Sequence, residues 1–368
     1  MDAAALFQPF HLKSLHLKNC LVMAPMTRSF ATGGIITPES ARYYKQRAAG
    51  EVGLILSEGT VIDRGSSANE PDIPHFHGAP ALAGWQHVID AVHEAGGAMG
   101  PQLWHMGLME DHSSGWLPPT PFEGPSGLDR AGHPKGVQLT DADIADIVAA
   151  FGKAALAAKQ LGFDCLELHG AHGYLIDQFF WELTNKRTDK YGGQTLAERT
   201  RFAVEVVQEV RQQVGEDFAI ILRISQWKPN DYAYQLAKSP AELEAWLAPL
   251  GAAGVDIFHC SQRRFWEPQF ADSDLNFAGW AKKVSGKPTI TVGSVGLTGE
   301  FLSGLQGESA EPRALDELLR RFDRGDFDLV AVGRPLLADP SWARKIRENR
   351  TAELKGFTKE SLTRLVTD

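Results

Sequence analysis

The sequence is poor in cysteine and has no excess of positive charge, and each shortage excludes a class of protein. Only Cys20, Cys165 and Cys260 occur, without a C-x-x-C pair. Neither a disulfide framework nor a four-cysteine iron–sulfur site can therefore be built. The 37 Lys and Arg residues are outnumbered by 46 Asp and Glu, which gives a net charge of −9. A basic surface for nucleic acid or anionic lipid is accordingly not expected.

Long apolar runs are missing as well. No stretch approaches the roughly 20 apolar residues of a membrane span. The first residues, MDAAALFQPFHLK, lack the cationic and apolar regions of a secretory signal. With 43% hydrophobic and 23% charged residues, the composition is that of an ordinary globular protein. We expect a cytoplasmic protein that does not bind a membrane.

Short runs rich in Val, Ile and Leu recur along the 368 residues. They do not alternate with polar residues, which is typical of parallel strands covered on both faces. These runs are 21–24, 53–57, 98–103, 165–168, 219–224, 255–260, 288–292 and 328–332. Apolar residues at helical spacing lie between them, at 38–50, 84–95, 140–161, 197–214, 239–252, 276–284 and 312–324. Eight strands that alternate with helices predict a (β/α)₈ TIM barrel.

No linker or charge run divides this pattern, so we expect residues 1–368 to form a single domain. A doubly wound sheet is the alternative, but the G-x-G-x-x-G and G-x-x-x-x-G-K-[ST] patterns are absent. Residues 6–19, LFQPFHLKSLHLKN, alternate around a tight connection and predict a β-hairpin that caps the N-terminal mouth of the barrel. The long loop after the third strand, at 106–137, is rich in Gly and Pro and is expected over the active site.

The active site of a TIM barrel lies at the C-terminal ends of its strands. Gly293 and Ser294 follow the seventh strand, and Gly333 and Arg334 follow the eighth. Gly-rich turns at these two places typically bind phosphate, and an arginine adds a bidentate cation. Further candidates lie at or after the other strand ends, namely Pro25, Met26, Thr27, Gly59, Gln102, Trp104, His169, His172, Tyr174, Arg223, Phe265 and Trp266.

The residues alone leave two other functions open. His169 and His172 could bind a metal with His105 as a third ligand, as in a metal-dependent barrel hydrolase. The strand ends offer few carboxylates for such a site, and the eighth carries the cation of Arg334. A non-catalytic binder of a phosphate ligand is the second alternative, although it gives Tyr174 no role. Arg223 could also serve as a buried ion-pair partner of Glu167.

Several segments together resemble the Old Yellow Enzyme family of FMN-dependent ene-reductases. They follow the family's order over nearly the whole chain, and the most specific is a His-x-x-His-Gly-Tyr strand end followed by R-T-D-x-Y-G-G. The segments are MAPMTR (23–28), SEGTVI (57–62), PQLWH (101–105), ELHGAHGYLIDQF (167–179), NKRTDKYGG (185–193), LRIS (222–225) and VGRPLLADP (332–340).

The resemblance implies an oxidoreductase that holds one FMN non-covalently and takes electrons from NADPH or NADH. It would reduce the C=C bond of α,β-unsaturated carbonyl or nitro compounds by a ping-pong mechanism. Hydride would pass from flavin N5 to Cβ, and Tyr174 would give a proton to Cα. His169 and His172 would donate hydrogen bonds to the substrate carbonyl oxygen.

The remaining candidates take cofactor or substrate roles by the same resemblance. Gln102 would bind the flavin pyrimidine, and Arg223 would place positive charge near N1 and O2. Pro25, Met26, Thr27 and Gly59 would lie beside the ring; Gly293, Ser294, Gly333 and Arg334 would hold the phosphate; Trp104 with Phe265 or Trp266 would shape the substrate side. No metal site is implied. The physiological substrate, the preferred nicotinamide, the oligomeric state and the protonation of the two histidines stay open.

Overall fold

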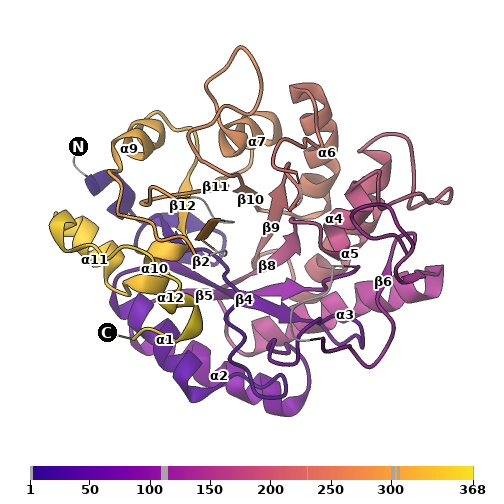
Figure 1. The fold of residues 1–368 in the computed structure, drawn as a ribbon, viewed down its shortest axis with the longest axis horizontal. Coiled ribbons are helices and arrows are strands. Elements are labelled where there is room, and N and C mark those ends of the chain that lie inside the picture. Colours follow the sequence, from indigo (N-terminus) through magenta and orange to yellow (C-terminus); the bar gives the residue numbers. More distant parts are fainter. Residues whose placement is uncertain (1–2, 109–114, 230, 300–302, 305–306, 368) are drawn as a thin grey trace.

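Eight parallel strands close into a barrel at the centre of the molecule (Figure 1). The computed structural model describes residues 3–108, 115–229, 231–299, 303–304 and 307–367. In chain order the barrel strands are β3 (Leu21–Met23), β4 (Leu54–Val61), β5 (Ala98–Trp104), β8 (Cys165–Gly170), β9 (Ala219–Ser225), β10 (Ile257–Ser261), β11 (Thr289–Val292) and β12 (Leu329–Val332). Strand β12 pairs with β3 and closes the barrel. The predicted TIM barrel is confirmed, and each apolar run forms a strand.

Helices surround the strands on the outside (Figure 1). The longer ones are α1 (Pro38–Ala49), α2 (Ala79–Glu94), α3 (Asp141–Gln160), α5 (Arg201–Val214), α6 (Pro240–Ala253), α7 (Phe277–Ser285) and α9 (Asp316–Asp323). Thr37, Thr140, Ser239 and Asn276 each accept a backbone N–H at a helix start, which explains why these helices begin there. Among the described residues, no helix is long and apolar enough to cross a membrane.

Shorter helices complete the chain. They are α4 (Leu175–Phe180), α10 (Arg334–Ala338), α11 (Trp342–Arg347) and α12 (Glu360–Thr363). Figure 1 shows the last of these beside α1, close to the C-terminus. Single 3₁₀ turns lie at Ala3–Phe7, Glu198–Thr200 and Thr351–Glu353.

Residues alternate between the helix side and the inside of each strand. In β8, Leu166 and Leu168 belong to the core that the helices cover, whereas Cys165 belongs to a second apolar cluster inside the barrel. The hairpin of β1 (Phe10–Leu12) and β2 (Leu15–Leu17) packs its buried leucines into that inner cluster. The predicted hairpin therefore exists and closes the N-terminal mouth, which leaves the opposite mouth for a ligand.

The long loop after β5 packs beside the C-terminal mouth. Its short strands β6 (Glu123–Gly124) and β7 (Val137–Gln138) pair with each other. Arg64 holds it to the barrel with two hydrogen bonds to Glu123, at 2.7 and 2.6 Å. Phe122 packs in a small cluster with side chains of the barrel rim. The part at 109–114 lies outside the described residues.

Candidate active site

A cavity of about 720 Å³ lies at the C-terminal ends of the strands. It brings together every site residue that the sequence predicted except Phe265 and Trp266. The lining includes Pro25, Met26, Thr27, Gly59, Gln102, Trp104, His169, His172, Tyr174, Arg223, Gly293, Ser294, Gly333 and Arg334. Residues up to 309 positions apart in the chain therefore line one cavity, as the strand ends of a barrel require.

One end of the cavity is built from the turns after β11 and β12. Gly293 has a φ of 148°, and a Cβ there would lie 2.3 Å from the carbonyl oxygen of Gln262. Ser294 is left-handed at φ 51° and donates from Oγ to the carbonyl oxygen of Gly299, 3.3 Å away. The same carbonyl accepts from Nη2 of Arg334 at 2.5 Å. This end thus combines close backbone turns with a buried guanidinium, a set of groups that suits a phosphate.

Arg223 also lines the cavity, and its guanidinium lacks part of its hydrogen bonding. Its Nη1 lies 3.5 Å from the carbonyl oxygen of Pro25. Its Nε is buried and has no hydrogen-bond partner among the described residues. Burial lowers the pKa of Arg223, and the attraction of Glu167 opposes that effect. A buried donor without a partner is costly, so this guanidinium fits a ligand that is rich in acceptors.

The end of β8 and the sharp turn after it bring His169, His172 and Tyr174 to the cavity lining. His172 and Gly173 both have positive φ, 63° and 78°, directly after β8. Asp177 accepts from the Gly173 N–H at 2.7 Å, which fixes the turn from the following helix. The ring of Tyr174 lies 4.7 Å from that of His169 in an edge-to-face arrangement. This segment therefore sets two imidazoles and one phenol against the same space.

Burial determines the protonation of these three groups. It lowers the pKa of His169 and of His172 well below the ordinary value, and the nearby charge of Arg223 acts in the same direction. Burial therefore favours the neutral form of both rings near pH 7. Burial also raises the pKa of Tyr174 to about 12. The phenol consequently keeps its proton at every pH at which the protein would work.

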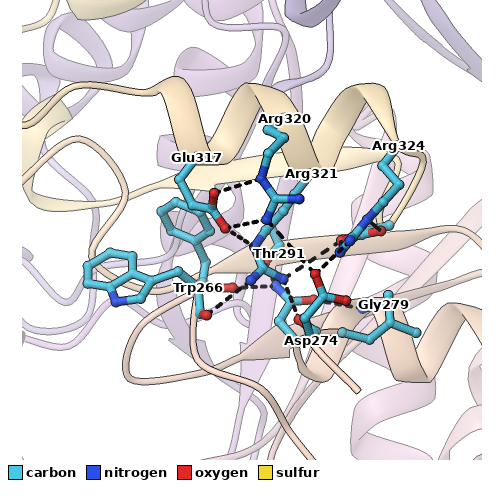
Figure 2. Close-up of polar contacts among 12 residues, drawn as sticks. Trp266, Asp274, Gly279, Thr291, Glu317, Arg320, Arg321 and Arg324 are labelled. Carbon is cyan, nitrogen blue, oxygen red and sulfur yellow. Dashed lines mark hydrogen bonds and ion pairs between the residues drawn. The ribbon is translucent and has the colours of Figure 1, made fainter. Parts of the chain in front are cut away.

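The loop after β10 does not carry Phe265 and Trp266 into the cavity. Figure 2 shows why: Arg321 of α9 donates to the carbonyl oxygens of Trp266 and Asp274, at 3.1 and 2.6 Å, and holds this loop against the helix. Phe265 is part of the core, and the Trp266 ring stacks under the guanidinium of Arg313 at 3.9 Å. The predicted substrate-wall role therefore finds no support in their position.

Other segments that the sequence did not indicate line the cavity instead. They are the loop after β4 with Asn69, Glu70, Asp72 and Ile73, the loop after β9 with Trp227, Pro229 and Tyr232, and Phe357 and Leu362 near the C-terminus. None of the described residues of the 106–137 loop lines it. Trp116 and Phe122 of that loop belong to the same small apolar cluster as Trp104 and Tyr174. These wall segments have no motif that marks them in the sequence.

Gly59 also lies close to Trp104. A Cβ at this position would lie 2.6 Å from the indole of Trp104. Glycine is therefore needed for the packing of that tryptophan, although the residue does touch the cavity.

The geometry does not favour a metal hydrolase. His105, the third ligand that such a site would use, bonds to Glu123 at 3.2 Å and does not line the cavity. Among the residues that the structure describes, no group of three or more His, Cys, Asp or Glu side chains is placed to hold a metal ion.

A TIM barrel with close turns after its last two strands, buried arginines and a His-His-Tyr group in one cavity suits a phosphorylated cofactor. A family model described as the NADH:flavin oxidoreductase / NADH oxidase family matches residues 5–353. The chain belongs to this family, and the resemblance to the Old Yellow Enzymes is confirmed. It is an NAD(P)H-dependent oxidoreductase with FMN as its cofactor.

Known proteins are similar over nearly the whole chain. The chain is 32% identical to 12-oxophytodienoate reductase 7 of Oryza sativa subsp. japonica, over 94% of this chain and 88% of that protein. It is 30% identical to NADPH dehydrogenase of Bacillus subtilis (strain 168), over 96% and 97%. The solved structure of the old yellow enzyme homologue from Zymomonas mobilis superimposes with a TM-score of 0.78 at 26% identity, covering 98% of this chain and 96% of that one. Morphinone reductase in complex with tetrahydroNAD gives a TM-score of 0.77 at 27% identity, over 98% and 97%.

Proposed function

We propose that the protein is an ene-reductase, which reduces the C=C bond of α,β-unsaturated carbonyl or nitro compounds. The observation that carries this proposal is the group of His169, His172 and Tyr174 in the cavity lining, where burial favours neutral imidazoles and a protonated phenol. Neutral imidazoles and a phenol can donate hydrogen bonds without first losing or gaining a proton.

The cavity offers a place for each part of FMN. Gly293, Ser294, Gly333 and Arg334 would hold the phosphate, and Gln102 with Arg223 would hold the pyrimidine edge. Pro25, Met26, Thr27 and Gly59 would lie along the ring. Bound FMN, once reduced by NADPH or NADH, supplies the hydride.

The two histidines would stabilise the substrate oxygen. Negative charge develops on a carbonyl oxygen when hydride reaches the β-carbon, and preorganised donors at that oxygen lower the barrier. His172 is already fixed, because its Nε2 lies 2.7 Å from Oγ of Ser261 and its backbone N–H donates to Ser225 at 3.0 Å. A ring with restrained orientation needs little reorganisation during the reaction.

Tyr174 would give the proton to the α-carbon. Its ring is packed edge-on against both Trp104 and His169, with centroids 4.7 Å apart in each case. These two neighbours restrain the orientation of the phenol. Because the histidines would bind the carbonyl oxygen, Tyr174 would be the group that protonates the α-carbon.

One cavity would serve both nicotinamide and alkene, because the sequence contains no Rossmann fingerprint for a separate dinucleotide site. Initial rates with NADPH and a cyclic enone should therefore give the parallel double-reciprocal lines of a ping-pong mechanism. The product should be the saturated ketone. Intersecting lines would argue for a ternary complex, and NADPH oxidation without any saturated ketone would rule out the ene-reductase activity.

A further inference from the structure

Glu167 lies inside the barrel, one layer beneath the cavity. It precedes His169 by two residues in β8, so both side chains point inward. The carboxylate is completely buried and is not part of the cavity wall. Apolar side chains such as Cys165 and Ile221 fill the barrel below it. Burying a carboxylate costs desolvation free energy that an apolar residue in the same space would not. The presence of a carboxylate here therefore points to a role other than stability.

The carboxylate has two hydrogen-bond donors. Gln102 donates from Nε2 to one oxygen at 2.7 Å, and His259 lies with Nδ1 2.6 Å from the other. Because a carboxylate only accepts, the amide nitrogen of Gln102 must face it. The amide oxygen of Gln102 is then the group available to a ligand in the cavity that Gln102 lines. Burial lowers the pKa of His259, and the attraction of Glu167 opposes that effect.

The carboxylate of Glu167 also affects the pKa of Arg223. His259 and Arg223 are register partners on β10 and β9, and His169 pairs with Arg223 on the other side. The charge of Glu167 raises the pKa of Arg223 against the effect of burial. Instead of forming the direct ion pair that the sequence left open, Glu167 therefore bonds to Gln102 and His259 and balances Arg223 through space.

We propose that Glu167 is a positioning residue for FMN. Through Gln102 it directs a hydrogen-bond acceptor at the N3–H of the pyrimidine edge, and its negative charge offsets Arg223 and lowers the reduction potential of the bound cofactor. This inference rests on the proposed placement of that edge between Gln102 and Arg223. Reduced flavin gathers negative charge at N1 and O2, so a carboxylate beneath this edge disfavours the reduced form.

The charge is tested with Glu167→Gln in the FMN-loaded protein. This variant keeps the side-chain shape and an acceptor for Gln102 but removes the charge. The reduction potential of bound FMN, measured by equilibration with a redox dye, should move to a more positive value than in the parent. A potential equal to that of the parent would overturn the electrostatic part of the proposal.

Asp256→Asn is the matched control. Asp256 is also a buried carboxylate, bonded to Arg211 at 2.6 Å, but it directly precedes β10 and pairs with Lys13 of the hairpin at the N-terminal mouth. Its variant should lose stability without moving the FMN potential. An equal shift in both variants would show that the change in Glu167→Gln has no specific origin.

The positioning is tested with Glu167→Asp, which keeps the charge but withdraws it from Gln102 by one methylene. The dissociation constant of FMN from the refolded or deflavinated protein should rise about fivefold, the effect of weakening one hydrogen bond. In a Gln102→Ala background the same substitution should change FMN affinity less than about twofold. Equal effects in both backgrounds would overturn the route through Gln102.

These measurements need no alkene, so they are separate from the proposed reaction. Enone turnover of the parent protein is recorded alongside. Absence of turnover would contradict the ene-reductase function, whereas the potentials and affinities would still decide the role of Glu167.

Discussion

Replacing Tyr174 with phenylalanine removes one hydroxyl group and leaves the rest of the wall in place. The ring keeps its edge-to-face contacts with Trp104 and His169, each at a centroid distance of 4.7 Å. No change in folding larger than about 1 kcal/mol is expected, because an aromatic ring of the same shape remains. The effect should instead fall on the step that needs a proton at the α-carbon. Loss of a general acid costs about 10²–10⁴ in rate, which corresponds to ~3–5.5 kcal/mol in the barrier.

The two half-reactions separate this role from a general defect. In an anaerobic stopped-flow experiment, reduction of the bound FMN by NADPH should continue at nearly the parent rate in Tyr174→Phe. Reoxidation by a cyclic enone should slow by the factor above, whereas reoxidation by oxygen, which requires no proton at carbon, should remain. Equal enone reoxidation in variant and parent would refute the assignment of Tyr174 as the proton donor.

Three further outcomes are expected. Arg334→Ala should weaken FMN binding about 10- to 100-fold, because a charge-assisted contact to phosphate is lost. Ultrafiltration of the yellow protein measures how much FMN stays bound. If the variant retains as much FMN as the parent, Arg334 is not part of the phosphate site. Lys228→Met should destabilise the protein by about 3–5 kcal/mol in urea unfolding, since the completely buried Asp177 loses its 2.6 Å partner, and the Lys228→Met, Asp177→Leu double variant should recover part of the loss. The free energy of unfolding should fall as the pH drops below about 6.5. Burial lowers the pKa of four histidines in the folded protein, so they take up protons more readily when it unfolds; they are His105, His169, His172 and His259. Burial raises the pKa of Glu58 to about 7, which acts in the opposite direction, but this is one group against four. A urea midpoint that rises on acidification would contradict the last prediction.

The barrel can be predicted from the sequence because buried parallel strands have a simple sequence pattern. Continuous apolar runs mark strands covered on both faces, and all eight runs form the barrel. The limits of elements are less visible. Strand β4 extends to Val61, beyond the predicted end at 57, because a shift in register between Leu56 and Gly59 carries the polar Glu58 within it. Helix α2 begins at Ala79, before the predicted 84, because a proline occupies its first turn.

The candidate site divides in the same way. Residues at strand ends are placed by the barrel itself, so those positions line the cavity as expected. Residues on loops depend on long-range contacts that no local pattern records. Trp266 does not line the cavity, and its segment is held to α9 because Arg321, 55 residues later, donates to its carbonyl oxygen. Leu362 reaches the cavity because Arg28 donates to the carbonyl oxygens of residues 361 and 364, at 2.9 and 2.8 Å.

A single turnover tests the central claim most directly. The FMN-loaded protein is reduced with one equivalent of NADPH without oxygen, freed of NADP⁺, and mixed with one equivalent of a cyclic enone. If the cavity with His169, His172 and Tyr174 is an ene-reductase site, the yellow colour of oxidised FMN returns and one equivalent of saturated ketone forms. If the flavin stays reduced until oxygen is admitted and no saturated ketone appears, the account of this site as an alkene-reducing centre is wrong.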